Sequence, residues 1–273
     1  MSETKPLKGI NLPSITSYTA EDLFSFLSIK EDMLVLDVRN EEDFSQFNVE
    51  GPFPFQMKNV PYINFMEEED ESVAKISNEK PVKIVCAKEG SAQYVGEILM
   101  RHGFEDVSYL INGIKSWGNL LLPKRINNES DDYALYQFIR PGKASCNYGL
   151  LYKREMVIFD PSRNIEFYQS FANENDAKIV RIFETHLQAD YISGSKQISN
   201  VTGAEILAHA GDFSEASFRF NQVNEGDTYT IGSNGPEIRV IHTPGHTPGS
   251  TSYIIDDKYF LSGDTMFINS IGR

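Results

Sequence analysis

Two histidines and an aspartate in the second half of the chain have residue types and positions suited to holding a metal ion. His186, His246 and Asp264 each follow shortly after an apolar run that predicts a strand. If those three strands lie side by side in one orientation, the three side chains converge on a single ion. Two imidazoles and one carboxylate leave coordination positions open for water, dioxygen or a substrate. Two neighbours in the sequence are candidates for a supporting role around this ion, Asp190 and His242.

A cysteine in the first half has the position of a reactive thiol. Cys86 ends the apolar run 82–86 and precedes a short loop and a predicted helix. The backbone N–H groups of such a loop and the positive end of a helix favour a thiolate, and equally the terminal sulfur of a persulfide. Lys88 adds a positive charge. The loop expected to surround the sulfur consists of Ala87, Lys88, Glu89, Gly90 and Ser91.

Structural interpretations stay open for the same residues. Cys86 could be a buried packing residue, and Asp264 could cap a turn. His242 precedes a Thr-Pro turn, which indicates that it braces a loop rather than binds metal. We assign purely structural roles to three further residues, Cys146, His102 and His209.

The elements that must position Cys86 alternate along residues 15–122. Apolar runs predict strands at 33–38, 59–63, 82–85 and 107–110, and amphipathic segments between them predict helices. Strands separated by helices indicate a parallel sheet covered on both faces. The expected fold of this half is therefore an α/β domain.

The histidines and Asp264 belong to a second domain with a different pattern. The polar segment 123–132 contains Asn, Asp and Ser and is the predicted linker. Beyond it, residues 133–273 mix hairpins with short helices. Strands are predicted at 144–152, 155–159, 178–183, 206–208, 237–241, 250–255 and 258–261.

The composition is that of an ordinary globular protein, and it excludes several classes of partner. Lys and Arg number 25 and Asp and Glu number 39, so the 273-residue chain carries a net charge of −14. Such an acidic chain offers no attraction to nucleic acid or to an anionic membrane. No stretch approaches the ~18 apolar residues of a membrane span. Two cysteines and an N-terminus without an apolar run indicate a reducing cytoplasmic location.

Three segments of the first half resemble the rhodanese family of sulfurtransferases. Their sequences are VLDVRNEEDF from Val35, VCAKEGSAQYVGEILMRHGF from Val85 and VSYLINGIKSW from Val107. The resemblance implies a parallel sheet flanked by helices over residues 15–122. It also implies that Cys86 is the nucleophile that carries sulfur.

Three segments of the second half resemble the metallo-β-lactamase superfamily. They are THLQADYISG from Thr185, HTPGHTPGS from His242 and LSGDTMFINSIGR from Leu261. The resemblance implies an αββα sandwich over residues 133–273, with a metal site at one edge of two packed sheets. The superfamily motif H-x-H-x-D-H is only partly present: His186 and Asp190 match it, whereas Gln188 and Tyr191 replace histidines.

The departures from the motif bear on the metal. Gln188 and Tyr191 are poor zinc ligands, so the set that survives is His186, His246 and Asp264. This is the facial triad expected of mononuclear non-haem Fe(II), and it is also the iron set implied by resemblance to the persulfide dioxygenases of the superfamily. One Fe(II) per chain is the expected cofactor, with zinc as the alternative. Arg273 stands where relatives place an arginine near the carboxylates of the thiol cosubstrate.

The resemblances together imply an enzyme of sulfur metabolism. It would oxidise a small thiol persulfide, such as glutathione persulfide, with O2 to sulfite, and would couple this reaction to sulfur transfer through Cys86. The alternatives are a zinc-dependent, glyoxalase II-like thioester hydrolase and a chain with rhodanese activity alone. Because the family's fold continues past the IGR motif, we expect a truncated C-terminus. The expected partners are small molecules, and a homo-oligomer is compatible with the sequence.

Overall fold

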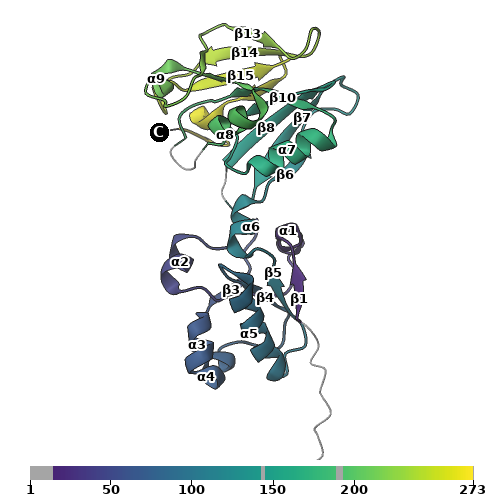
Figure 1. The fold of residues 1–273 in the computed structure, drawn as a ribbon, viewed down its shortest axis with the longest axis vertical. Coiled ribbons are helices and arrows are strands. Elements are labelled where there is room, and N and C mark those ends of the chain that lie inside the picture. Colours follow the sequence, from purple (N-terminus) through teal and green to yellow (C-terminus); the bar gives the residue numbers. More distant parts are fainter. Residues whose placement is uncertain (1–14, 143–144, 189–192, 273) are drawn as a thin grey trace, which may run out of the picture. The chain divides into compact units, whose positions relative to one another are not determined.

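The computed structural model describes residues 15–142, 145–188 and 193–272. These residues form two compact units, drawn in Figure 1: one runs to Leu120, and the other holds most of the chain from Leu121 onward. Among the described residues, no helix is long and apolar enough to cross a membrane. Each unit has its own hydrophobic core, so each is described separately.

The first unit is built on a five-stranded sheet in the order β1-β5-β4-β2-β3. Every neighbouring pair is parallel, which confirms the predicted α/β architecture. All residues of β2 and β4 are buried, as expected for central strands covered on both faces. The strands are β1 (Thr16–Tyr18), β2 (Leu34–Asp37), β3 (Gln56–Asn59), β4 (Val82–Val85) and β5 (Val107–Leu110).

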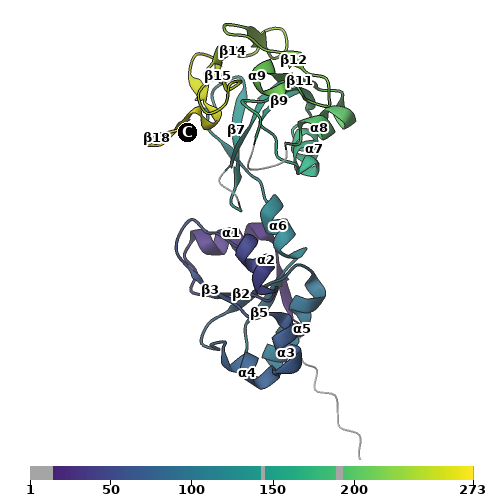
Figure 2. The same ribbon diagram turned by 90° about the vertical axis from the view of Figure 1, so that its left-hand side faces the viewer.

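Helices cover both faces of this sheet (Figure 2). Phe65, Val73 and Val95 pack helices α3, α4 and α5 onto one face, and α1, α2 and α6 lie on the other. The first helix begins with a capping box, because the Thr19 hydroxyl accepts the Asp22 N–H and the Asp22 carboxylate accepts the Thr19 N–H. The helices are α1 (Ala20–Ser28), α2 (Glu41–Gln46), α3 (Tyr62–Glu67), α4 (Glu69–Ala74), α5 (Glu89–Arg101) and α6 (Gly113–Asn119).

One predicted strand of this unit is wrong. The run at 59–63 was expected to be a strand, but β3 ends at Asn59 and α3 begins at Tyr62. Pro61 stands at the start of that helix, where its fixed φ is favourable and its missing N–H costs nothing. The helix then places Phe65 fully in the core, which is where the apolar character of the segment is used.

The second unit contains a seven-stranded mixed sheet in the order β12-β11-β10-β9-β8-β7-β6. The antiparallel pairing of β8 with β9 confirms the predicted hairpin, and β9, β10, β11 and β12 pair in parallel. The strands are β6 (Leu122–Arg125), β7 (Ala134–Arg140), β8 (Ser145–Tyr152), β9 (Glu155–Phe159), β10 (Lys178–Phe183), β11 (Glu205–Ala208) and β12 (Asn221–Gln222).

The predicted linker at 123–132 requires a correction. Its first residues belong to β6, which pairs antiparallel with β7 from Leu122 to Arg125 and so forms the edge of the seven-stranded sheet. The Asn127 side chain then forms hydrogen bonds with backbone groups of the turn after β6. Its amide donates to the Tyr133 carbonyl, and its oxygen accepts the Leu135 N–H. The polar residues that suggested a linker are therefore part of a hydrogen-bonded turn within the second unit.

A four-stranded antiparallel sheet, β13-β14-β15-β16, packs face to face on the seven-stranded sheet. Phe159 and Phe183 of the larger sheet meet the ring of Tyr253 on β15, with centroids 5.5 and 5.0 Å apart. The strands are β13 (Thr228–Thr230), β14 (Glu237–His242), β15 (Thr251–Ile255) and β16 (Tyr259–Leu261), followed by the hairpin of β17 (Met266–Phe267) and β18 (Ser270–Ile271).

Helices cover the outer face of the seven-stranded sheet. Tyr168 of α7 (Ile165–Glu174) and Ile198 of α8 (Ser195–Thr202) are fully buried against Ile158 and Ile182. A third, single-turn helix, α9 (Ala210–Phe213), follows β11. The order helix, sheet, sheet is the core of the sandwich that the sequence predicted.

Candidate functional site

His186, His246 and Asp264 are brought together at one edge of the two packed sheets. One ligand atom from each side chain lies within 4.8 Å of the other two. The Oδ2 atom of Asp264 is 3.9 Å from Nε2 of His186 and 3.7 Å from Nε2 of His246. The His186 side chain is only 4% exposed, whereas that of Asp264 is 37% exposed, so the cluster is closed on one side and open to solvent on the other.

The route by which these residues converge differs from the expectation. The three preceding strands do not lie side by side, because β10 is in the seven-stranded sheet while β14 and β16 are in the four-stranded sheet, with β15 between them. The ligands meet because the two sheets pack face to face and the segment after each strand turns toward the same edge. The site therefore depends on the docking of the sheets and not on the pairing of neighbouring strands.

A hydrogen-bonded chain fixes the orientation of the His186 ring. The Thr185 hydroxyl donates to Oδ2 of Asp160 at 2.8 Å, and its oxygen lies 2.9 Å from Nδ1 of His186. Because the single hydroxyl proton is given to Asp160, the hydroxyl oxygen accepts the Nδ1–H of the imidazole. The Nε2 atom is then left with its lone pair toward Asp264, as a metal ligand requires.

The turn carrying Asp264 needs a glycine next to Thr185. Gly263 has a φ of +49°, and a Cβ atom there would lie 2.4 Å from the Thr185 hydroxyl oxygen. The absence of a side chain therefore lets the 3-10 turn (Gly263–Thr265) approach the strand end that carries His186.

Two buried carboxyl groups lie behind the cluster. Burial raises the pKa of Asp160, although hydrogen bonds from Thr185 oppose this shift. Burial, and then the nearby charge of Asp160, raise the pKa of Glu184 to about 8. The hydroxyls of Ser193 and Ser195 donate to Oε1 of Glu184. No sequence pattern marks either group: Asp160 meets Thr185 from 25 residues away, and Glu184, two residues before His186, is an ordinary acidic residue until the fold buries it.

Of the other residues predicted near the metal, one contacts the His186 ring, one braces a nearby loop and three are not described. Gln188 places its amide nitrogen 3.4 Å from Nδ1 of His186, on the side of the ring opposite to its ligand atom. His242 stacks on His209 with ring centroids 4.1 Å apart, and its Nε2 lies 3.1 Å from the Pro248 carbonyl, so it braces a loop. Burial, followed by the proximity of His242, lowers the pKa of His209. Three residues lie outside the described residues: Asp190, Tyr191 and Arg273.

Cys86 lies directly after the central strand β4 and before α5 in the first unit. The thiol is free and the residue is 4% exposed. Its carbonyl accepts the Ile114 N–H at 2.8 Å, and a Cβ atom at Gly113 would lie 2.2 Å from that carbonyl oxygen. The start of α6 is thus pressed against the cysteine, and only glycine permits this approach.

The loop after Cys86 has the predicted position at the start of a helix. Lys88, with an extended backbone, precedes the first residue of α5, and no side chain caps this helix end. The Glu89 carboxylate accepts the Asn112 N–H at 2.7 Å and so ties the loop to the turn before α6. The loop therefore leaves backbone N–H groups at the N-terminal end of α5 available to an anionic sulfur.

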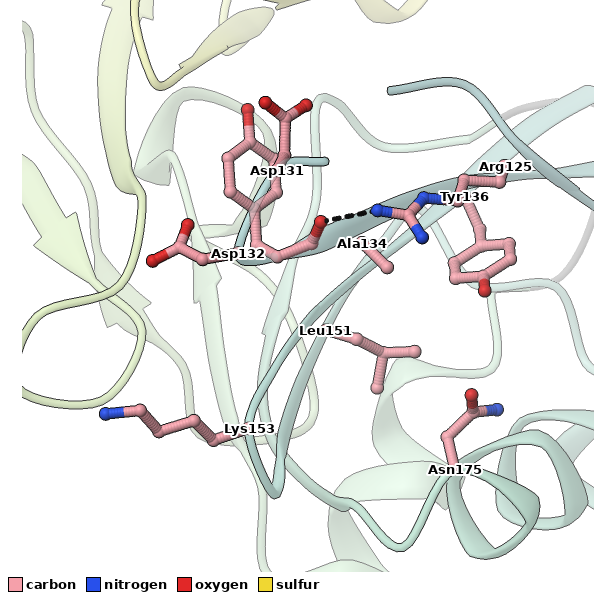
Figure 3. A pocket seen from close by; sticks show the side chains of 9 residues that line it. Arg125, Asp131, Asp132, Ala134, Tyr136, Leu151, Lys153 and Asn175 are labelled. Carbon is pink, nitrogen blue, oxygen red and sulfur yellow. Dashed lines mark hydrogen bonds between the residues drawn. The ribbon is translucent and has the colours of Figure 1, made fainter. Parts of the chain in front are cut away.

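A polar pocket of about 330 Å³ lies elsewhere in the second unit (Figure 3). Arg125 reaches into it but donates to the Tyr133 carbonyl at 3.0 Å, as the dashed line in the figure marks. Asp131, which also lines it, accepts hydrogen bonds from the turn of the β6–β7 connection. The pocket contains none of the predicted site residues. Arg125 and Asp131 instead form hydrogen bonds that hold the β6–β7 connection.

The comparisons with known families agree with this division of the chain. Residues 20–120 match the rhodanese-like domain, and residues 141–273 match the metallo-beta-lactamase superfamily. The chain therefore contains a rhodanese-like domain followed by a metallo-beta-lactamase-fold domain. These are enzyme families, and the second fold implies a divalent metal at the cluster of His186, His246 and Asp264.

Several relatives of this chain are named as hydrolases. A hydroxyacylglutathione hydrolase of Rhodospirillum rubrum is 38% identical over 96 residues, which cover 35% of this chain and 37% of the relative. One of Prochlorococcus marinus is 28% identical, covering 44% and 49%. A probable polyketide biosynthesis zinc-dependent hydrolase of Bacillus velezensis is 29% identical, covering 44% and 53%. The chain thus spans about a third to a half of the length of these relatives; the expected truncation stays a prediction.

Solved structures are also similar to about half of this chain. A metallo-beta-lactamase from Staphylococcus aureus is 26% identical with a TM-score of 0.49, covering 52% of this chain and 46% of that one. ETHE1 from Myxococcus xanthus is 24% identical with a TM-score of 0.42, covering 56% and 61%.

Proposed function

We propose that the second domain is a single-metal enzyme that hydrolyses a thioester of a small thiol such as glutathione. The observation that carries the proposal is the convergence of two imidazoles and one carboxylate, whose ligand atoms lie within 4.8 Å of one another. The names of the relatives favour hydrolysis over the oxidation that the sequence analysis put first. The name of the Bacillus velezensis relative, a zinc-dependent hydrolase, favours zinc over iron.

The donor set fits such an ion. Three protein ligands with an open position are typical of catalytic zinc, which, when bound, would polarise a carbonyl and supply hydroxide at neutral pH. Within the chain, Thr185 holds His186 in the tautomer that directs Nε2 to the cluster. The exposed side of Asp264 is the side from which a substrate can enter.

The first domain is proposed to carry sulfur on Cys86. A thiolate at this position would attack the outer sulfur of a donor such as thiosulfate, form a persulfide on Cys86 and release sulfite. The position of the thiol between β4 and the uncapped start of α5 supports this role, because free N–H groups stabilise the negative terminal sulfur. Lys88 is the nearest basic residue in the loop sequence.

A specific observation favours persulfide oxidation as the second candidate function. Gln188 occupies the place of a motif histidine and contacts the His186 ring at its non-ligand nitrogen. Among the described residues, the metal-binding group has only the three ligands of a facial triad, which is typical of non-haem Fe(II) oxygenases. Glutathione persulfide and O2 would then be the substrates and sulfite a product, which suits fusion to a sulfur carrier.

One experiment separates the two candidates. The full chain is loaded anaerobically with either zinc or Fe(II), and hydrolysis of a hydroxyacyl thioester of glutathione is measured beside O2 uptake with glutathione persulfide. Hydrolysis by the zinc form without O2 uptake by the iron form supports the proposal. The opposite pattern replaces hydrolysis with oxidation. His246→Ala is the control, because this residue supplies one of the three ligands. A variant that keeps its metal-dependent activity would contradict both candidate functions.

A further inference from the structure

Asp212 connects the two loops that carry the candidate metal-binding histidines. It lies in the single-turn helix α9 and is not itself in the ligand cluster. Its carboxylate accepts three hydrogen bonds. Oδ2 accepts the Leu187 N–H at 3.0 Å and the Thr247 hydroxyl at 2.6 Å, and Oδ1 accepts the Gly249 N–H at 2.7 Å.

The donors are adjacent to the ligands in the sequence. Leu187 directly follows His186, and Thr247 directly follows His246. One oxygen atom of Asp212 is therefore shared between two segments that come from different sheets. Within the described residues, this carboxylate is a direct polar link between the two histidine loops, so moving it would change the separation of the imidazoles.

The close contact between α9 and the loop after His246 requires two glycines. A Cβ atom at Gly249 would lie 2.5 Å from the Asp212 nitrogen and 2.7 Å from its Oδ1 atom, and one at Gly211 would lie 2.9 Å from the Gly249 Cα atom. Backbone thus packs directly against backbone at this point. Two main-chain N–H groups hold the Asp212 carboxylate at this close backbone contact. It therefore has little freedom to move if either histidine loop is displaced.

We propose that Asp212 is a positioning residue that sets the distance between His186 and His246 and thereby the affinity of the cluster for its metal. The proposal rests on the single-metal site proposed above. A carboxylate suits this role because both of its oxygens only accept, and all three partners donate. An asparagine would offer one accepting oxygen, and its NH2 group would face at least one N–H or hydroxyl donor.

The test compares zinc binding by Asp212→Asn with that by the unaltered full chain, using competition with a chromophoric chelator. Loss of an outer partner of a metal ligand typically lowers affinity by about 10- to 100-fold, and we expect this range here. Substituted Co²⁺ should show altered d–d absorption in the variant, because the ligand geometry changes. Asp227→Asn is the matched control: Asp227 also accepts hydrogen bonds that hold a loop of the same domain, but from Asn224.

Thr247→Val is a milder second variant that keeps the test valid if Asp212→Asn does not fold. It removes one of the three hydrogen bonds, so zinc affinity should fall by a smaller factor, about threefold to tenfold. Zinc affinity within twofold of the unaltered chain in a folded Asp212→Asn or Thr247→Val protein would overturn the proposal. So would an unaltered chain that binds no zinc. A chain that binds zinc but hydrolyses no thioester rejects the proposed function and leaves the role of Asp212 to be decided by the affinities.

Discussion

The two candidate sites of this chain differ in how their parts are distributed along the sequence. Cys86 and its loop form one uninterrupted segment between β4 and α5. The metal cluster draws His186, His246 and Asp264 from segments that belong to two different sheets. The first site therefore takes its residues from one strand, one loop and one helix start, held by the turn before α6, whereas the second exists only when both sheets are docked. Variants that damage one site and spare the other test this difference.

The largest effect is expected from Cys86→Ser. Sulfur transfer from thiosulfate to cyanide should fall by more than about 10³-fold, because removal of a nucleophile eliminates the covalent step. Zinc binding should stay unchanged, because Cys86 and the cluster are in separate units. Cys146→Ser, which alters the exposed cysteine, serves as the control and should retain transfer. Transfer that survives Cys86→Ser would reject the assignment of the nucleophile.

The reciprocal variant is His246→Ala. Loss of a ligand should reduce zinc affinity by more than the roughly 100-fold that marks the loss of an outer partner, and the metal-dependent reaction should disappear. Sulfur transfer through Cys86 should stay within twofold. His102→Ala is the matched histidine control, because His102 contacts Glu69 in the first unit and is not in the cluster. Equal zinc affinities for the two variants would argue against the cluster as the metal site.

A smaller effect is expected from Thr185→Val. This change removes the hydroxyl that accepts from His186 and donates to Asp160, so the imidazole loses its fixed tautomer. We expect about a 10-fold loss of zinc affinity, measured by chelator competition. Thr185→Ser keeps the hydroxyl and should bind zinc like the unaltered chain. If valine and serine behave alike, the hydrogen-bonded chain does not orient the ligand.

The last prediction concerns the dependence of stability on pH and not the activity of either site. Because the pKa of Glu184 is raised to about 8, the folded state holds a proton that the unfolded state releases at lower pH. The free energy of opening should therefore fall as pH rises from about 4.5 to 8, by at most ~1.4 kcal/mol per unit. Glu184→Gln should flatten this dependence.

Hydrogen exchange of the β10 amides in metal-free protein measures this opening free energy within the second unit. Fluorescence of Trp117, the single tryptophan, reports on the first unit and provides an internal control that Glu184→Gln should not affect. A pH dependence that is equally steep with and without Glu184 would exclude this carboxyl as its source.

The two sites also differ in how well the sequence predicted them, because the parts of one are adjacent in the sequence and those of the other are not. The strand before Cys86 and the helix after it are adjacent in the sequence, so their pattern alone located the loop. The three candidate metal ligands were selected because each follows a predicted strand, although the strands lie in two sheets. Asp160 and Asp212 could not be found, because their partners are 25 to 37 residues away and only the packed structure brings them together.

Local misassignments also have physical causes. The segment around Pro61 has the apolar composition of a strand, yet the proline starts a helix and Phe65 fills the core from it. The residues after Leu122 look like a linker, yet Asn127 uses their polarity to close a turn at a sheet edge. In both places, side-chain chemistry at a single position outweighed the average character of the segment.

The placement of Asp264 in the 3-10 turn after β16 has a consequence for biosynthesis. Chains emerge from the ribosome N-terminus first, and domains generally fold as units in that order. Cys86 and its surrounding elements are synthesised long before Asp264. We therefore expect a nascent chain to acquire a folded thiol site while its third candidate metal ligand has yet to be translated, so that metal capture follows the folding of the first domain.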